Sequence, residues 1–197
     1  MVPACRLLAV AALGVTVGLT AAIGAATAAT AAPRSKAGLT AAQRAFLDTA
    51  AVQARSSQRR YGVPASVVIA QTVLETGWGT SELARTSRNY FGMTCGPAGA
   101  GPVAETCRDG RDRVCTRSGC RATISSFRVY RSMADSFADH GRLMSTNPRY
   151  SKAFAARSNP EAFAKRLARA GYATDPRYAQ RLIKIIKKYQ LRRHDKR

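Results

Sequence analysis

The sequence predicts a mainly helical domain that carries one small β-rich lobe. Apolar residues recur at helical spacing in several segments, and most of these segments begin at a capping residue or end at a glycine. Between them lies a window, residues 92–121, that is rich in glycine and cysteine and shows little periodicity. The 197-residue chain has the length of one domain with its own hydrophobic core.

The first predicted helices occupy residues 40–85. Thr40 with Gln43 three residues later is a capping-box pattern, which predicts a helix to about residue 60. The apolar positions of this helix are Phe46, Leu47, Ala50 and Val52. Pro64 suits the first position of a second, strongly apolar helix that ends at Gly77. A short helix is expected near residues 81–85.

The remaining elements follow the glycine-rich window. The apolar residues Ile124, Phe127, Val129 and Tyr130 predict a strand that closes the lobe. Ser132, Asn159 and Thr174 each precede a segment of helical spacing, which predicts helices to about residues 145, 171 and 189. The apolar positions of the last helix are Tyr178, Leu182, Ile185, Ile186 and Tyr189.

Residues 1–31 are typical of a secretory signal peptide. They contain one charged residue, Arg6, then a long apolar run, and the small residues Ala29-Thr30-Ala31 suit cleavage. No later segment approaches the roughly 20 apolar residues that span a bilayer. We therefore expect a secreted protein with a flexible lead-in at residues 32–39. An uncleaved N-terminal anchor is the alternative.

Cysteine usage agrees with export. Four cysteines remain after the predicted signal: Cys95, Cys107, Cys115 and Cys120. An even number in an exported chain indicates two disulfides, and three pairings are possible. We favour Cys95–Cys107 and Cys115–Cys120 because neighbours in a short irregular segment reach each other most easily. A structural zinc site is less favoured because no Cys-x-x-Cys pair occurs.

The chain is strongly basic, with a formal net charge of +21. Residues 141–197 hold 16 basic and 3 acidic side chains, including the basic tail at residues 192–197. Such a surface concentrates polyanions at low ionic strength. For an exported protein, anionic cell-wall polymers are the expected partner. A merely solvated helix face, or an exported nucleic-acid or membrane binder, are the alternatives.

Glu75 is the carboxylate that stands out. It ends an apolar helix and precedes Trp78, whose flat face suits a sugar ring. Desolvation and the negative end of the helix dipole would both raise its pKa, which is what a general acid requires. A solvated glutamate in the last turn is the alternative. His140 and His194 lack metal-ligand spacing, so neither a metal site nor a cofactor is predicted.

Four blocks of sequence resemble the glucosaminidase family of peptidoglycan hydrolases, glycoside hydrolase family 73. The blocks agree in order and spacing over about residues 42–191. The matching pieces are Ala70-Gln71, Leu74-Glu75-Thr76-Gly77-Trp78-Gly79, Ser81-Glu82-Leu83-Ala84, Asn89-Tyr90-Phe91-Gly92, Phe127-Arg128-Val129-Tyr130, Asp135-Ser136-Phe137-Ala138-Asp139-His140, Arg149-Tyr150, Gly171-Tyr172-Ala173-Thr174-Asp175-Pro176 and Tyr178-Ala179.

The resemblance implies a lysozyme-like catalytic domain at residues 40–191, with the β-lobe over a cleft, that acts as an endo-β-N-acetylglucosaminidase on peptidoglycan. It implies Glu75 as general acid and Tyr172 across the cleft near the reacting sugar. Side chains implied to shape the sugar subsites are Trp78, Asn89, Tyr90, Phe91 and Tyr130, and ordinary core packing is the alternative for each of the aromatic residues. We expect a cell-wall-associated monomer with no nucleic-acid partner.

The β-lobe departs from the family in one respect. Many members carry a second glutamate there within a Thr-x-Glu pattern, and residues 92–121 contain none. The lobe offers Glu105, Asp109 and Asp112, of which Glu105 is our choice. The substrate's own acetamido group could replace a missing carboxylate. Two other activities stay open: an N-acetylmuramidase on the same fold, and a wall-binding protein without catalysis.

Overall fold

The structure is a computed structural model that describes residues 38–97, 99–116 and 119–195, without the side chains of residues 113–116. The predicted signal peptide and most of the predicted lead-in lie outside the described residues. The helices are α1 (Ala41–Tyr61), α2 (Ala65–Thr76), α3 (Glu82–Ser87), α4 (Met133–Thr146), α5 (Ser151–Phe154), α6 (Pro160–Arg169) and α7 (Tyr178–Lys188). Two 3-10 turns, η1 (Pro148–Tyr150) and η2 (Leu191–His194), and two strands complete the described part of the chain, which confirms the mainly helical class.

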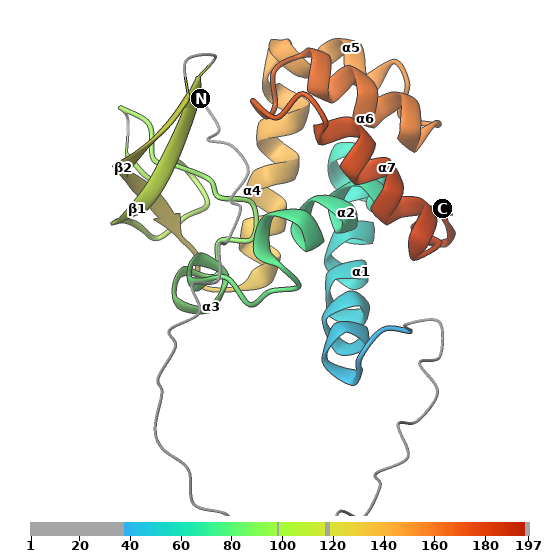
Figure 1. The fold of residues 1–197 in the computed structure, drawn as a ribbon, viewed down its shortest axis with the longest axis horizontal. Coiled ribbons are helices and arrows are strands. Elements are labelled where there is room, and N and C mark those ends of the chain that lie inside the picture. Colours follow the sequence, from blue (N-terminus) through green and yellow to red (C-terminus); the bar gives the residue numbers. More distant parts are fainter. Residues whose placement is uncertain (1–37, 98, 117–118, 196–197) are drawn as a thin grey trace, which may run out of the picture.

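Helix α2 runs through the middle of the helical body (Figure 1). Every residue from Ala65 to Val73 is buried, and the helix contacts α1, α6, α7 and η2. Because α2 is apolar on all sides, it is stable only when other helices cover it. Burial ends at Leu74 and Glu75, which are half-buried. The last turn of α2 is therefore where the core meets solvent.

Helix α1 begins at the predicted capping box. The hydroxyl of Thr40 accepts from the backbone N–H of Gln43, and the Gln43 side chain accepts from the Thr40 N–H. Gly62 ends the helix in the left-handed conformation. Val52 is 53% exposed, whereas Ala51 and Ala54 face the core. The small alanine side chains allow α1 to pack closely against α2 and α4.

The β-lobe is a single antiparallel hairpin of β1 (Thr106–Thr116) and β2 (Gly119–Val129). It lies to one side of the helical body (Figure 1). The predicted Cys95–Cys107 disulfide is confirmed and ties the preceding loop to β1. Cys120 is also disulfide-bonded, and the strand register pairs it with Cys115, whose side chain lies outside the described residues.

A buried ion pair joins this lobe to the helical body. Arg128 of β2 donates to the carboxylate of Asp139 on α4, which is 1% exposed. The same carboxylate accepts from the Tyr130 hydroxyl at 2.9 Å, and Arg128 also donates to the Thr94 carbonyl at 3.1 Å. A buried carboxylate without these donors would be costly. The pair therefore fixes where the hairpin leaves the core.

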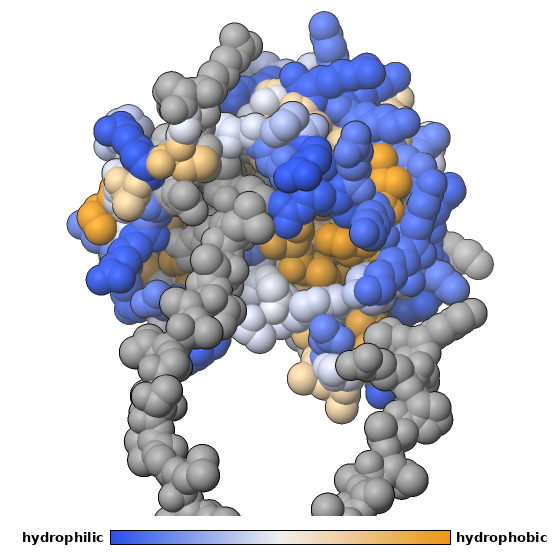
Figure 2. All heavy atoms as spheres, viewed as in Figure 1, coloured by the Kyte–Doolittle hydropathy of each residue, from blue (hydrophilic) through white to orange (hydrophobic). Residues whose placement is uncertain are grey.

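The last helix begins slightly later than predicted, whereas α6 begins at Pro160 after Asn159, as predicted. Residues 174–177 form a turn in which Asp175 accepts from the Arg177 N–H at 2.8 Å and from Arg181 at 3.1 Å, so α7 starts at Tyr178. Leu182 and Ile186, on the inner face of α7, are fully buried. Hydrophilic side chains cover most of the outer surface of α5–α7 (Figure 2). None of the helices in the described ranges has the length and apolar composition of a membrane crossing.

Replacing Gly141 with alanine should destabilise the protein. Gly141 lies where α4 crosses α1, and a Cβ atom there would overlap the Ser57 hydroxyl and approach the Tyr61 ring to 2.5 Å. Overpacking of this kind costs about 1–3 kcal/mol, more than alanine gains in helix propensity. Chemical denaturation of Gly141→Ala should show this loss. The exposed position Ser145→Ala on the same helix should change stability by less than about 0.5 kcal/mol.

Candidate functional site

Glu75 lies in the last turn of α2, half-buried at the edge of the core. The chain then turns sharply, because Gly77, Trp78 and Gly79 all have positive φ. Two hydrogen bonds close this turn: the Thr76 hydroxyl accepts from the Gly79 N–H at 2.7 Å, and the Thr76 carbonyl accepts from the Ser81 N–H at 2.9 Å. A tryptophan in this conformation costs about 1–3 kcal/mol, which the surrounding contacts must offset.

A chain of buried polar side chains lies behind Glu75. The Tyr178 hydroxyl hydrogen-bonds with the Glu75 carboxyl and with Tyr172, and it accepts from the amide of Gln71 at 3.1 Å. The Tyr172 hydroxyl lies 3.1 Å from Nε2 of His140. Residues from α2, α4, α7 and the turn after α6 thus form one group of polar side chains that reaches the Glu75 carboxyl.

Burial sets the protonation of this chain. Desolvation, followed by the nearby Glu75 charge, raises the pKa of Tyr172 well above its usual value. Desolvation also raises the pKa of Tyr178, with the charges of Tyr172 and Glu75 adding to it. Desolvation alone lowers the pKa of His140 from its usual 6.5 to about 3. Both phenols and the imidazole are therefore neutral near pH 7, and the site holds one acidic group within a set of neutral donors.

Trp78 belongs to a half-buried aromatic cluster beside Glu75. The cluster consists of Phe46, Trp78, Tyr90 and Tyr189. Trp78 packs edge-on against Tyr189 at 5.0 Å and against Phe46 at 6.4 Å between ring centroids, and Phe46 contacts Tyr90 at 6.3 Å. Part of each ring is accessible. Flat apolar surface next to a carboxyl group is suited to a ligand with an apolar ring face.

The other three predicted subsite residues point into the fold. Asn89 donates to the carbonyls of Met93 and Arg128, and its side-chain oxygen accepts from the Met93 N–H at 2.9 Å. Phe91 is 1% exposed and stacks on His140 with ring centroids 3.9 Å apart. Tyr130 is fully buried and donates to Asp139. Their side chains shape the site by packing from behind.

The three carboxylates of the lobe differ in position. Glu105 is exposed at the base of the hairpin, where its N–H donates to the Val129 carbonyl at 2.9 Å. Asp109 is exposed in the middle of β1. Asp112 accepts from the Ser125 hydroxyl at 2.7 Å across the strand pair. Among the described residues, no cluster of three or more histidine, cysteine or acidic side chains could hold a metal ion.

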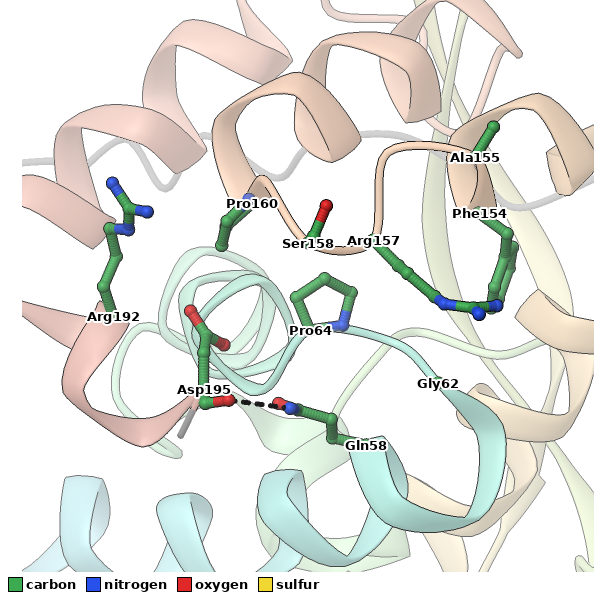
Figure 3. A pocket seen from close by; sticks show the side chains of 10 residues that line it. All are labelled: Gln58, Gly62, Pro64, Phe154, Ala155, Arg157, Ser158, Pro160, Arg192 and Asp195. Atoms are coloured by element: carbon green, nitrogen blue, oxygen red, sulfur yellow. Dashed lines mark hydrogen bonds between the residues drawn. The ribbon is translucent and has the colours of Figure 1, made fainter. Parts of the chain in front are cut away.

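A cavity of about 820 Å³ lies away from Glu75, where α1 ends, α2 begins and η2 closes over both (Figure 3). None of the predicted site residues lines it. Asp195 accepts from the Ser66 N–H at 2.8 Å through its carboxylate and from Gln58 at 3.0 Å through its carbonyl, the bond drawn as a dashed line in Figure 3. Leu191 is fully buried. The turn at η2 is thus packed against the start of α2.

A second hollow, of about 610 Å³, lies between α5 and the end of α6. Its lining includes four exposed basic side chains and no acidic one: Arg149, Lys152, Arg166 and Arg169. We call it the basic groove. It adjoins the turn that carries Tyr172, because Ala170 lines it and Tyr150, next to Arg149, contacts the Tyr172 ring at 5.9 Å.

Sequence reasoning assigned no role to three residues of the chain behind Glu75: Gln71, His140 and Tyr178. Each occurs in one of the quoted sequence blocks, and Gln71 is a polar residue within a buried apolar run. A polar residue within an apolar helix could therefore have identified Gln71 as a candidate site residue. Tyr178 occupied an apolar position of the last helix and was therefore interpreted as core.

Comparisons with known proteins agree with this geometry. Residues 51–191 match the family described as mannosyl-glycoprotein endo-beta-N-acetylglucosaminidase. The chain is 36% identical over 151 residues to the peptidoglycan hydrolase FlgJ of Pseudomonas aeruginosa, and 35% identical over 158 residues to the exo-glucosaminidase LytG of Bacillus subtilis. These alignments cover 74% and 78% of this chain but 36% and 54% of the relatives, so the chain spans about a third to a half of their length.

Solved structures show the same likeness. A peptidoglycan hydrolase mutant from Sphingomonas sp. A1 is similar with a TM-score of 0.66 and 34% identity, over 77% of this chain and 97% of that one. The catalytic domain of the autolysin Auto from Listeria monocytogenes is similar with a TM-score of 0.66 and 28% identity, over 81% and 90% of the two chains. These neighbours confirm the expected lysozyme-like fold.

The buried, neutral His140 should make the protein sensitive to acid. Its pKa is lower in the folded state, so protons bind preferentially to the unfolded chain below pH 6.5. The stability contributed by neutral His140 is fully present above about pH 6.5 and is lost towards pH 3, by at most about 1.4 kcal/mol per pH unit. Denaturation of the native protein and of His140→Gln across this range measures the difference. Parallel pH dependences would contradict the prediction.

Proposed function

Because the chain belongs to the mannosyl-glycoprotein endo-beta-N-acetylglucosaminidase family, we propose that it is a peptidoglycan hydrolase that cleaves glycan strands on the reducing side of N-acetylglucosamine, with Glu75 as general acid. The observation that carries this proposal is the environment of Glu75: a half-buried carboxyl at the end of an apolar helix, bonded to a neutral phenol and followed three residues later by Trp78 of the half-buried aromatic cluster. Family relatives named peptidoglycan hydrolase and exo-glucosaminidase support the substrate class.

Glu75 would protonate the glycosidic oxygen as the bond to the leaving sugar breaks. The general acid must be protonated before this step and becomes a carboxylate during it. Tyr178 is placed to donate to the carboxylate that forms, and Trp78 and Tyr90 would offer their accessible faces to sugar rings. Tyr172 is 2% exposed, and its hydroxyl bonds inside the chain, so it would act on Glu75 through Tyr178.

Glu105 is our candidate for the second catalytic group. It is exposed on the lobe, as a group that activates water must be accessible. Inverting hydrolysis requires a base roughly 6.5–9.5 Å from the acid, and retention by a carboxylate nucleophile requires about 5–5.5 Å. If no lobe carboxylate takes part, the acetamido oxygen of the substrate would serve as nucleophile.

An N-acetylmuramidase is the second candidate activity. One relative, a protein named probable N-acetylmuramidase from Lactococcus lactis, is 33% identical over 157 residues, which is 77% of this chain and 34% of that protein. Both activities need the same general acid and differ in which sugar occupies the subsite before the cut. The third candidate is a wall-binding protein without catalysis. It would require that the absence of the Thr-x-Glu pattern from the lobe abolishes turnover.

We also propose that the enzyme is secreted and held at the cell wall by charge. The predicted signal peptide supports secretion. The basic groove offers four cations without a neighbouring acid, which suits the phosphate or carboxylate groups of anionic wall polymers. The charges lie on η1, α5 and α6 as well as on the C-terminal residues 192–197, so retention would not depend on the C-terminal residues alone.

Glu75→Gln should abolish glycan cleavage. An amide cannot give up the proton that the leaving oxygen needs, and loss of a general acid lowers rates by about 10²–10⁴-fold. Purified peptidoglycan with blocked reducing ends would be digested, the new ends reduced with borohydride, and the reduced sugar identified by mass spectrometry. New N-acetylglucosamine ends would support a glucosaminidase, and N-acetylmuramic acid ends would support the muramidase.

Two variants serve as references in the same digest. Glu161→Gln alters a surface ion pair with Lys187 and should keep full activity. Glu105→Gln should lower turnover if this residue is the second group, whereas unchanged turnover in amide variants of Glu105, Asp109 and Asp112 would favour the acetamido nucleophile. A folded native protein that releases no new ends would favour the wall-binding reading.

Neutralising the basic groove should weaken retention on the wall. The quadruple variant Arg149→Gln, Lys152→Gln, Arg166→Gln and Arg169→Gln should be released from sedimented cell walls at a lower salt concentration than the native protein. A matched variant loses the same charge elsewhere, at the exposed Arg44, Arg59, Arg60 and Arg85. Equal release of both variants would show that net charge, and not the groove, holds the protein.

A further inference from the structure

The basic groove adjoins the turn that leads to the proposed general acid. Ala170 lines the groove, Gly171 is exposed, and Tyr172 follows as part of the polar chain behind Glu75. Gly171 has a positive φ, and a Cβ atom placed there would meet nothing within 4 Å. The open space at this glycine leaves room for a ligand that extends from Glu75 to the groove.

The groove carries positive charge that the described part of the chain does not neutralise. Its four basic side chains are exposed, and none of them forms an ion pair with a described acidic side chain. Arg166 also donates to the Lys152 carbonyl at 3.0 Å, which joins α6 to α5. The groove volume of about 610 Å³ falls within the range of small-ligand sites, roughly 300–1,000 Å³. Clustered cations of this kind suit a ligand with several anionic groups.

We propose that the basic groove is a subsite for the peptide stem of the muramic acid nearest the cut, and that its cations bind the carboxylate groups of that stem. The inference rests on the proposed function, since it takes peptidoglycan as the substrate. It narrows the partner of the groove to one component of the cell wall. The enzyme would therefore prefer glycan strands that carry stems to stem-free strands.

The peptide stem has the chemistry that this groove requires. In peptidoglycan a short peptide is attached to the lactyl group of muramic acid, and its carboxylates outnumber its ammonium groups. Guanidinium groups bind carboxylates through paired hydrogen bonds. Because the two sugars of the strand alternate, a muramic acid adjoins the cut in either candidate activity. One stem therefore begins within one sugar of the proposed acid.

The span between the groove and Glu75 also suits a stem. Burial raises the pKa of the Tyr150 hydroxyl, and the Arg149 guanidinium beside it acts in the opposite direction. The Tyr150 ring contacts Tyr172 at 5.9 Å, and Tyr172 stacks on Tyr178 at 5.5 Å between centroids. The Tyr178 hydroxyl in turn meets the Glu75 carboxyl. An extended stem of four residues reaches about 13–14 Å, which is longer than these two ring contacts together.

Replacing two of the cations should reduce the preference for stems. Lys152→Gln with Arg169→Gln removes half of the groove's charge and keeps the Arg166 bond to the Lys152 carbonyl. The preference is the ratio of kcat/KM on strands with stems to kcat/KM on the same strands after an amidase has removed the stems. We expect this ratio to fall about 3- to 10-fold, mainly through KM.

A matched variant, Arg44→Gln with Arg59→Gln, loses the same charge from exposed positions of α1 and should keep the native preference. An equal fall in both variants would show that net charge sets the preference, and it would overturn the proposal. Equal cleavage of stem-bearing and stem-free strands by the native enzyme would overturn it as well.

Two further ligands identify the anion that the groove binds. Stems whose carboxylates have been converted to amides keep their bulk but lose their charge, so strands that carry them should be cut like stem-free strands. A soluble glycerol-phosphate polymer, added as a competitor, tests phosphate as the anion. If the Lys152/Arg169 variant loses binding of this polymer but keeps the native preference for stems, the groove serves phosphate polymers and the proposal is wrong.

Binding of an isolated stem tetrapeptide separates this proposal from the proposed function, because the peptide has no glycosidic bond. In an NMR titration the native protein and Glu75→Gln should bind the peptide equally, and the Lys152/Arg169 variant should bind it more weakly. Equal binding by that variant would overturn the stem subsite, whatever the activity. If Glu75→Gln still cleaves strands, the proposed general acid is wrong, whereas the peptide titration still decides the role of the groove.

Discussion

The complete burial of α2 is the constraint on which the rest of the structure depends. From Ala65 to Val73 the helix has no solvent-facing side, so α1, α6, α7 and η2 must surround it. The apolar run ends one residue before Glu75, and glycines in the left-handed conformation then turn the chain away. A carboxyl group is thereby held at the boundary between a dry core and solvent, which is the environment in which acid–base chemistry is most easily tuned.

The polar side chains behind that carboxyl are as deeply buried as the apolar core. His140, Tyr172 and Tyr178 come from separate elements and stack against one another or against Phe91 while they hydrogen-bond in series. Packing of the rings fixes the positions of these side chains, and hydrogen bonds link their polar atoms. Because each group is buried, a change at one end is felt by the other through few intervening atoms.

The β-lobe is attached by different means. A disulfide and the Arg128–Asp139 ion pair hold its base, whereas the middle of the hairpin has exposed side chains such as Ile124, at 64%. The helical body thus provides the proposed acid, and the lobe provides the candidates for the second group. The lobe lacks the Thr-x-Glu pattern that many family members carry. This difference leaves the proposed general acid in place and concerns the nucleophile, which is either an activated water or the acetamido group of the substrate.

The sequence alone predicted the main helices, a small β-lobe and the singular position of Glu75, and it favoured the Cys95–Cys107 bond among three pairings, because caps, apolar periodicity and short loop separations act locally. Only the tertiary structure decided which side chains meet Glu75: Tyr178 lies about 100 residues further along the chain and looked like core. It also turned Asn89, Phe91 and Tyr130 inward, as the hydrogen-bonding demand of the loops and the lobe required. Contacts between distant residues form when the helices pack together, so no local sequence pattern predicts them.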